Sequence, residues 1–268
     1  MSEPIAKRNI YDKNGVLLLA KGQKATETVI KKLKRRGGYE QEAAVHPQDK
    51  VNESILPIAM RLGERLDIRN VRALEDANKI LSTIIFESKS KPWWIFVNAL
   101  TNYVDWLYTH SIDVAVISLM MAVELKFSDK ELWNLGLGAF FHDVGKLLIP
   151  KSIILKPMPL NDMEMVCIRQ HCDLGMTSLA PFNLPGNCTD IVLQHHERLD
   201  GSGYPKGLVG DEICRNARIV MVADAIDAIT SGRPYKDAKD MDTAIKILRD
   251  ENEKYPQELI PMLESIPN

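Results

Sequence analysis

The 268-residue chain has few of the features of a secreted, membrane-embedded or disulfide-stabilised protein. Its four cysteines lack the paired spacing of a zinc site: Cys167, Cys172, Cys188 and Cys214. We predict reduced thiols that pack between helices, as in a reducing compartment. The N-terminus has no apolar signal-peptide core, and the run Val114 to Val123 is shorter than a membrane helix requires. We therefore expect a cytoplasmic protein with no membrane partner.

An excess of charge of one sign is also missing. The chain has 34 Lys and Arg against 36 Asp and Glu, a formal net charge of -2. Such a balance gives no general attraction to DNA or to anionic lipid, so DNA is not an expected partner and any phosphate-binding charge must be local. With 45% hydrophobic and 26% charged residues, the composition is that of a globular protein able to bury a sizeable core.

Histidine is scarce, but its distribution is uneven. Of six histidines, five lie between positions 110 and 196: His110, His142, His171, His195 and His196. A lone histidine on an apolar face is usually a satisfied core residue. Histidines used only for packing would not be expected to gather in this way beside Asp143 and Asp224. The set as a whole therefore predicts a metal centre.

The first 45 residues differ in pattern from the rest. The turn signal Asp12 to Gly15 precedes the apolar run Val16 to Ala20, which predicts a short hairpin. Thr26 then begins a lysine- and arginine-rich amphipathic helix that ends at Gly37. We predict a small α/β module of unknown role at 1–45, with the basic helix face solvated rather than forming a phosphate or partner patch.

Helical periodicity continues through the remainder of the chain, with proline and glycine at its breaks. We predict helices near 50–67, 70–88, 92–124, 129–141, 160–179, 187–197, 215–230 and 241–264. Residues 46–90 are expected to be a helical connecting segment, and 91–268 the main domain. The predicted fold class is an all-α helical bundle behind the small N-terminal module.

Phosphodiester hydrolysis at neutral pH needs a strong nucleophile and positive charge near phosphorus. Two metal ions about 3.5–4 Å apart can supply both. Such a pair requires six or seven imidazole and carboxylate ligands, and the sequence offers seven: His110, His142, Asp143, His171, His195, His196 and Asp224. Adjacent helical residues lie about 100° apart, so neighbours such as His142 and Asp143 can bracket one ion. We predict Asp143 as the bridging carboxylate. Asp224 lies on an apolar helix face, where a carboxylate is costly unless paired or metal-bound.

The segment after the second histidine pair cannot continue a helix. Gly201, Gly203, Pro205 and Gly207 follow one another closely. Here the backbone can approach a ligand, and Tyr204 can stack or hydrogen-bond with a base or ribose. We predict a substrate wall that includes Gly203, Tyr204 and Pro205.

These motifs together resemble the HD-GYP family. The matching residues are His142-Asp143-x-Gly145-Lys146, His171, His195-His196-Glu197-x-x-Asp200-Gly201-x-Gly203-Tyr204-Pro205, and the run from Asp224 to Lys236. The resemblance spans about 105 to 265. It implies an all-helical HD core and a bacterial phosphodiesterase that opens cyclic di-GMP to the linear dinucleotide, GMP or both. It also implies that the seven histidines and aspartates are metal ligands and that a metal-bridging hydroxide attacks phosphorus.

Further roles follow from the same resemblance. Lys146, Arg233 and Lys236 match positions that contact substrate phosphate, where arginine can fork onto the oxygens and lysine adds a point charge. Lys146 is also a candidate to stabilise charge or to act as the general acid, as is a metal-bound water. Asp227, three residues after Asp224, and Asp200 are expected behind the ligands, orienting them. For Asp227 a solvated or capping role is the alternative.

One departure from the family pattern concerns the number of metals. Three-metal members have a glutamate four residues before the first histidine, and here that position is Trp106. Asp105 is turned some 140° from the His110 direction on a helix and is a poor replacement. We therefore predict two divalent ions. The mixed ligand set favours iron or manganese without excluding nickel or zinc.

Two alternatives stay open on the sequence. The same metals would cut cyclic GMP-AMP or another phosphoester, because the motifs do not separate guanine from adenine. A non-catalytic module could instead sense the dinucleotide, or dock a cyclase or other signalling protein. The intact ligand set favours the enzyme.

Overall fold

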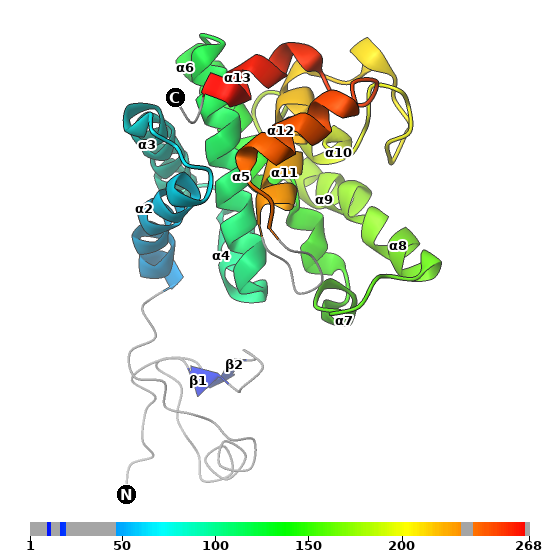
Figure 1. Cartoon of the computed structure of the whole chain (residues 1–268). Coiled ribbons are helices and arrows are strands. Elements are labelled where there is room, and N and C mark those ends of the chain that lie inside the picture. Colours follow the sequence, from blue (N-terminus) through cyan, green and yellow to red (C-terminus); the bar gives the residue numbers. More distant parts are fainter. Residues whose placement is uncertain (1–9, 12–16, 20–46, 232–237, 266–268) are drawn as a thin grey trace, which may run out of the picture. The chain divides into compact units, whose positions relative to one another are not determined.

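The computed structural model describes residues 10–11, 17–19, 47–231 and 238–265, and the chain divides into two units, Met1–Gln48 and Asp49–Asn268 (Figure 1). In the first unit, β1 (Ile10–Tyr11) pairs antiparallel with β2 (Leu17–Leu19), which confirms the predicted hairpin. The helix predicted from Thr26 lies outside the described residues. So do Arg233 and Lys236, two of the predicted phosphate contacts.

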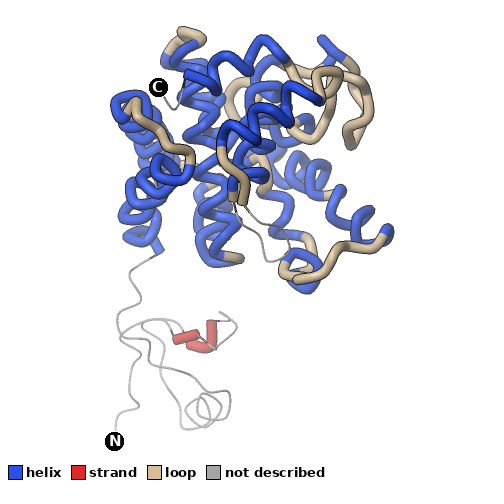
Figure 2. The backbone as a smooth tube through the Cα atoms, viewed as in Figure 1, coloured by secondary structure: helices blue, strands red, loops and turns tan. Residues whose placement is uncertain are grey.

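The named elements in the described part of the second unit are all helices, which confirms the all-α prediction (Figure 2). Its longer helices are α2 (Pro47–Arg65), α3 (Val71–Ser88), α4 (Trp94–Tyr103), α5 (Asp105–Glu124), α6 (Asp129–Phe141), α8 (Asp162–Arg169), α9 (His171–Leu179), α10 (Cys188–Gln194), α11 (Arg215–Thr230) and α12 (Met241–Asp250). Short elements are η1 (Val144–Leu148), α7 (Lys151–Ile154), η2 (Ala180–Phe182), η3 (Gly210–Glu212), η4 (Gln257–Leu259) and α13 (Ile260–Ser265).

Helix α5 forms the centre of the unit, with α3, α6 and α11 packed around it (Figure 1). Its apolar residues, such as Ile112 and Val116, are completely buried. By length and composition the stretch Trp106–Glu124 would also suit a membrane span, but 83% of it is buried inside the structure. That burial is what a core helix requires.

Helices α2 and α3 belong to the same core. Leu62 of α2 and Leu81 and Ile84 of α3 are buried in one hydrophobic cluster with the residues of α5 and α6. The segment 46–90, expected to connect two parts, therefore contributes its apolar faces to the second unit.

The predicted helix boundaries need three corrections. The helix predicted at 92–124 is broken at Val104, whose extended backbone (φ -149°, ψ 125°) separates α4 from α5. The helix predicted at 160–179 is broken at Gln170, so that α9 begins at His171. The last predicted helix ends at Asp250 as α12, and α13 begins only after Pro256, because proline lacks the amide proton and disfavours helix in the preceding residue.

Candidate metal centre

The structure brings the seven predicted ligands together in two groups. One consists of His110, His142 and Asp224, and the other of Asp143, His171, His195 and His196. Within each group the potential ligand atoms lie within 4.8 Å of one another. Six of the seven side chains are buried and His196 is partly buried. A cluster of this composition can bind metal ions.

The local fold explains how five elements converge. A capping box between Ser128 and Glu131 begins α6, whose buried second half ends at Phe141 and delivers His142 and Asp143. The other ligands lie on α5, at the start of α9, just after α10, and on α11. His142 and Asp143 fall in different groups, whereas the neighbours His195 and His196 share one.

Asp143 belongs to the second group, but its carboxylate also faces the histidines of the first. Its Oδ2 is 3.3 Å from His110 Nε2 and 3.4 Å from His142 Nε2. Its Oδ1 is 3.2 Å from His171 Nε2 and 3.8 Å from His195 Nε2. One carboxylate with its two oxygens facing two histidine pairs has the arrangement that a bridging ligand requires.

The outer nitrogens of four histidines are held by acceptors. Because a carbonyl or carboxylate oxygen can only accept, the ring nitrogen beside it must carry the proton. The Nδ1 groups of His110, His142, His171 and His195 face, in that order, Asp227 Oδ2 (2.6 Å), Ala139 O (2.7 Å), Ile168 O (2.6 Å) and Val192 O (3.0 Å). In the neutral rings the unprotonated Nε2 atoms therefore point inward. This is the tautomer that a metal ligand needs.

The inward ring nitrogens face one another as acceptors. Nε2 of His142 is 3.2 Å from Nε2 of His110, and Nε2 of His171 is 3.3 Å from Nε2 of His195. Asp143 Oδ1 is buried and has no hydrogen-bond donor among the described residues. Lone pairs at such distances repel unless a cation or a proton lies between them. The donor set therefore fits divalent ions.

The protonation states agree with this fit for most of the cluster. Burial acts to raise the pKa of Asp143, but the charge of Lys146 beside it holds that pKa well below its usual value. Burial lowers the pKa of His195 to about 4. For His110, burial opposes hydrogen bonds to three carboxylates, which raise its pKa well above the usual value. At His110 a proton thus competes with a metal ion, since only the neutral ring can ligate.

Two charged side chains form hydrogen bonds with proposed ligands. Asp227 is buried and its Oδ2 accepts from His110 Nδ1, so it orients a proposed ligand rather than facing solvent. Lys146, predicted to contact phosphate, donates from Nζ to Asp143 Oδ2 at 2.5 Å. It also lines the cavity beside the cluster. Lys146 is thus placed to touch both the central carboxylate and a ligand in that cavity.

Glu197 is a residue whose role the sequence analysis did not assign. Its side chain is fully buried, its Oε1 accepts from the amide of Lys206 (2.8 Å) and its Oε2 from that of Leu208 (3.0 Å). Gly203 packs against the same turn, where a Cβ would lie 2.4 Å from Glu197 Cα. The glutamate therefore fastens the glycine-rich loop next to the histidine pair. An acidic residue directly after two predicted ligands was the available signal.

Tyr204, predicted to belong to a substrate wall, lies beside the histidine pair. The Tyr204 ring stacks on His196, with centroids 4.7 Å apart, and the Arg169 guanidinium lies over the Tyr204 ring, 5.1 Å from its centroid. Asp200, expected behind the ligands, instead accepts from the amide and hydroxyl of Ser202 (2.9 and 2.6 Å). Its hydrogen bonds shape the exposed turn of the loop, because a short acidic side chain readily bonds its own backbone two residues on.

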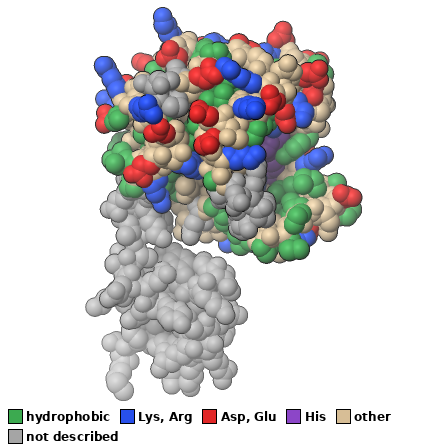
Figure 3. All heavy atoms as spheres, viewed as in Figure 1, with side chains coloured by type: hydrophobic (Ala, Val, Ile, Leu, Met, Phe, Trp, Pro, Cys, Tyr) green, Lys and Arg blue, Asp and Glu red, His purple; other side chains and the backbone are tan. Residues whose placement is uncertain are grey.

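A cavity of about 260 Å³ adjoins the cluster, lined by Lys146, His196, Arg198, Asp224, Ala225, Ala228, Ile229 and Tyr255. Figure 3 shows histidine atoms in a recess on this face of the molecule.

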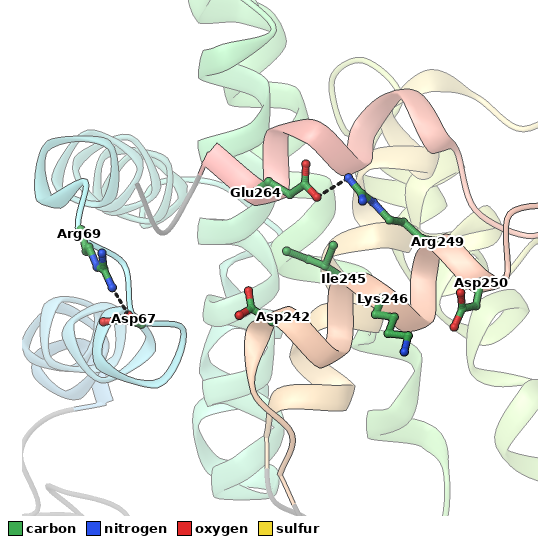
Figure 4. A pocket seen from close by; sticks show the side chains of 8 residues that line it. All are labelled: Asp67, Arg69, Asp242, Ile245, Lys246, Arg249, Asp250 and Glu264. Atoms are coloured by element: carbon green, nitrogen blue, oxygen red, sulfur yellow. Dashed lines mark hydrogen bonds and ion pairs between the residues drawn. The ribbon is translucent and has the colours of Figure 1, made fainter.

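A larger cavity of about 600 Å³ lies between the α2–α3 loop and α12 and α13 (Figure 4). There Arg69 pairs with Asp67, and Arg249 with Glu264. The smaller cavity is the candidate substrate site because it meets the proposed ligands.

Trp106 is one turn before His110, as predicted, with ring centroids 6.5 Å apart. An indole thus stands where three-metal members of the resembled family have a carboxylate. Nothing in an indole ring can replace a carboxylate as a ligand.

Comparison with known proteins shows a family and several similar proteins. An HD domain family model matches residues 95–259. The chain is 44% identical over 133 residues to the cyclic di-GMP phosphodiesterase response regulator RpfG of Xanthomonas campestris pv. campestris (strain 8004), a stretch covering 48% of this chain and 35% of that protein. It is 37% identical over 177 residues to the 3'3'-cGAMP-specific phosphodiesterase 1 of Vibrio cholerae serotype O1, covering 63% of this chain and 41% of that one.

Among solved structures, an HDG"Y"P protein from Bdellovibrio bacteriovorus is similar, with a TM-score of 0.55 and 19% identity over 99% of this chain and 95% of that one. That likeness concerns the fold alone. The matches cover only about two fifths or less of the two phosphodiesterases named above.

Proposed function

This chain is a member of the HD domain family, and from that premise and its metal centre we propose that it is a metal-dependent phosphodiesterase that hydrolyses cyclic di-GMP. Family membership agrees with the HD-GYP resemblance of its motifs. The observation that carries the proposal is the position of Asp143, whose two oxygens face two separate histidine pairs. A docking or sensing surface has no need of such a cage.

His110, His142 and Asp224 would hold one ion, His171, His195 and His196 the other, and Asp143 both. When bound, two divalent ions supply an activated water and positive charge for the phosphate oxygens. Iron or manganese suits this imidazole and carboxylate set.

The chain's own residues then hold the ligands and grip the substrate. Lys146 steadies the central carboxylate and presents its ammonium group to the cavity, where it can offset phosphate charge. Tyr204, whose ring stacks on His196 and has the Arg169 guanidinium over it, remains a proposed contact to a base or ribose from the loop beside the histidine pair. Arg233 and Lys236 remain proposed phosphate contacts on the strength of the motif.

A second substrate is supported by one observation. The chain matches, over the greater length, a phosphodiesterase named for 3'3'-cGAMP. The metal centre would cut either dinucleotide, because it contacts phosphate and not the bases. Parallel assays with both substrates decide between them.

Removing the metals tests the enzyme against the sensor hypothesis. We expect chelation to abolish hydrolysis, and anaerobic reconstitution with ferrous iron or manganese to restore turnover of cyclic di-GMP. Product formation is measured against Asp143→Ala as the blank. If fully metal-loaded protein forms no more product than that blank from either dinucleotide, the chain is a binding module.

The metal count is a separate expectation. Because Trp106 occupies the position of the third-site glutamate, protein loaded with iron or manganese should contain two ions per chain. Elemental analysis gives the stoichiometry, and anomalous scattering from crystals gives the positions. Three ordered ions with a carboxylate such as Asp105 as a ligand would refute the two-metal assignment.

A further inference from the structure

We propose that Arg65, the last residue of α2, is a positioning residue of the metal centre that acts through Asp227 on His110. Arg65 lies outside residues 95–259, the region that matches the HD domain family. The proposal deepens the proposed function and rests on it for its turnover measurement, while its metal-binding measurement is independent of the substrate.

The contacts form an unbroken chain. Arg65 Nη2 donates to Asp227 Oδ1 at 2.5 Å, and Asp227 Oδ2 accepts from His110 Nδ1 at 2.6 Å. The opposite nitrogen of that ring, Nε2, lies 3.3 Å from Asp143 Oδ2 and 3.2 Å from Asp224 Oδ1. The Arg65 guanidinium thus positions the Asp227 carboxylate, and that carboxylate positions the His110 ring. The same ring faces the two acidic ligands.

Arg65 also serves a second buried acid. Its Nη2 is 3.1 Å from Asp113 Oδ2, and the side chains of Asp113 and Asp227 are only 5% and 3% exposed. Two carboxylates this close repel one another unless a cation lies between them. Without the guanidinium, this repulsion would favour rotation of the Asp227 side chain away from Asp113. Such a rotation removes the acceptor from His110 Nδ1 and frees the ring to rotate.

The backbone around Arg65 is firmly placed. Ile58 and Leu62 of α2, and Leu66 directly after Arg65, are buried in the main core. Arg65 itself keeps about a quarter of its side chain exposed, so it reaches the acids from the edge of the core. A helix that precedes the family-matched region therefore contributes a charged group to the metal centre.

The test measures Mn²⁺ binding by calorimetry in Arg65→Gln, Arg65→Lys and the matched control Arg61→Gln. Arg61 is an exposed arginine one turn earlier on the same helix. We expect Arg65→Gln to weaken the binding of one of the two ions about 10- to 100-fold, as loss of groups that orient metal ligands typically does. Arg65→Lys should recover part of that loss, and Arg61→Gln should bind as the unaltered protein does. With cyclic di-GMP, kcat should fall more than KM rises, because Arg65 does not touch the substrate.

A double-mutant cycle with Asp227→Asn separates positioning from mere structural support. If Arg65 acts through Asp227, Arg65→Gln should have little further effect on Mn²⁺ affinity in the Asp227→Asn background. Additive effects, or unchanged Mn²⁺ affinity in a folded Arg65→Gln protein, overturn the proposal. Should Arg65→Gln fail to fold, Arg65→Lys enters the same cycle with the same criteria. If the unaltered protein binds two ions but does not hydrolyse either dinucleotide, the proposed function fails while the affinity result still decides the role of Arg65.

Discussion

Asp143→Ala is expected to lose the binding of both metal ions and to reduce turnover by at least about a thousandfold. The reason is that both carboxylate oxygens face histidine pairs, and a methyl group can replace neither contact. Metal ions contribute several kcal/mol of charge stabilisation in such reactions, and each 1.4 kcal/mol is roughly tenfold in rate. Elemental analysis and turnover of cyclic di-GMP are the two measurements.

Asp190→Ala provides the control for this variant. Asp190 is exposed and lies on α10, the helix that leads to His195. Its replacement should leave both metal content and turnover close to those of the unaltered protein. Full metal content and activity in a folded Asp143→Ala protein would show that the ligands are assigned incorrectly.

Gly145→Ala is expected to destabilise the fold and damage the metal centre together. An added Cβ would lie 1.9 Å from the carbonyl oxygen of His171 and 2.6 Å from the amide nitrogen of Gly175. Both are backbone atoms, so η1 must move away from α9 as a whole. Overpacking of this kind typically costs about 1–3 kcal/mol, and here it would also separate Asp143 from His171. Urea unfolding gives the free energy of unfolding, and Mn²⁺ calorimetry gives the affinity.

The matched control is Gly63→Ala. Its Cβ would also meet a close neighbour, at 2.7 Å, but that atom is the end of the flexible Leu74 side chain. The side chain can turn aside, and alanine favours helix over glycine. We expect a much smaller effect than at Gly145. Equal losses of stability in the two variants would contradict the backbone-contact explanation.

The sequence was sufficient to predict the helical fold and the gathering of seven candidate ligands. The prediction of the ligands succeeded because they include two pairs of adjacent residues that each follow the end of a helix. These pairs are His142-Asp143 and His195-His196. Chemistry also limits the choice, since clustered histidines beside buried aspartates have few structural uses.

The sequence was insufficient to predict the helix breaks and the buried pairs of charged and polar groups, which depend on long-range contacts. Val104 and Gln170 interrupt helices although the helical periodicity of the sequence continues across them. The buried pairing of Glu197 with the loop amides, and that of Arg65 with Asp227, join residues through the tertiary fold. No local pattern distinguishes Arg65 from its solvated neighbours, whereas the position of Glu197 after two predicted ligands was a signal.

Helices α2 and α3 have a consequence for how such proteins can exchange modules. Leu62, Leu81 and Ile84 are buried in one core with α5, although all three precede the region that the family shares. The second unit thus begins well before the region that matches the HD domain family. A different N-terminal module could be grafted onto this protein upstream of residue 49 with its core intact. A graft joined at residue 95 would strip the apolar cover from α5 and leave the remaining helices without that support.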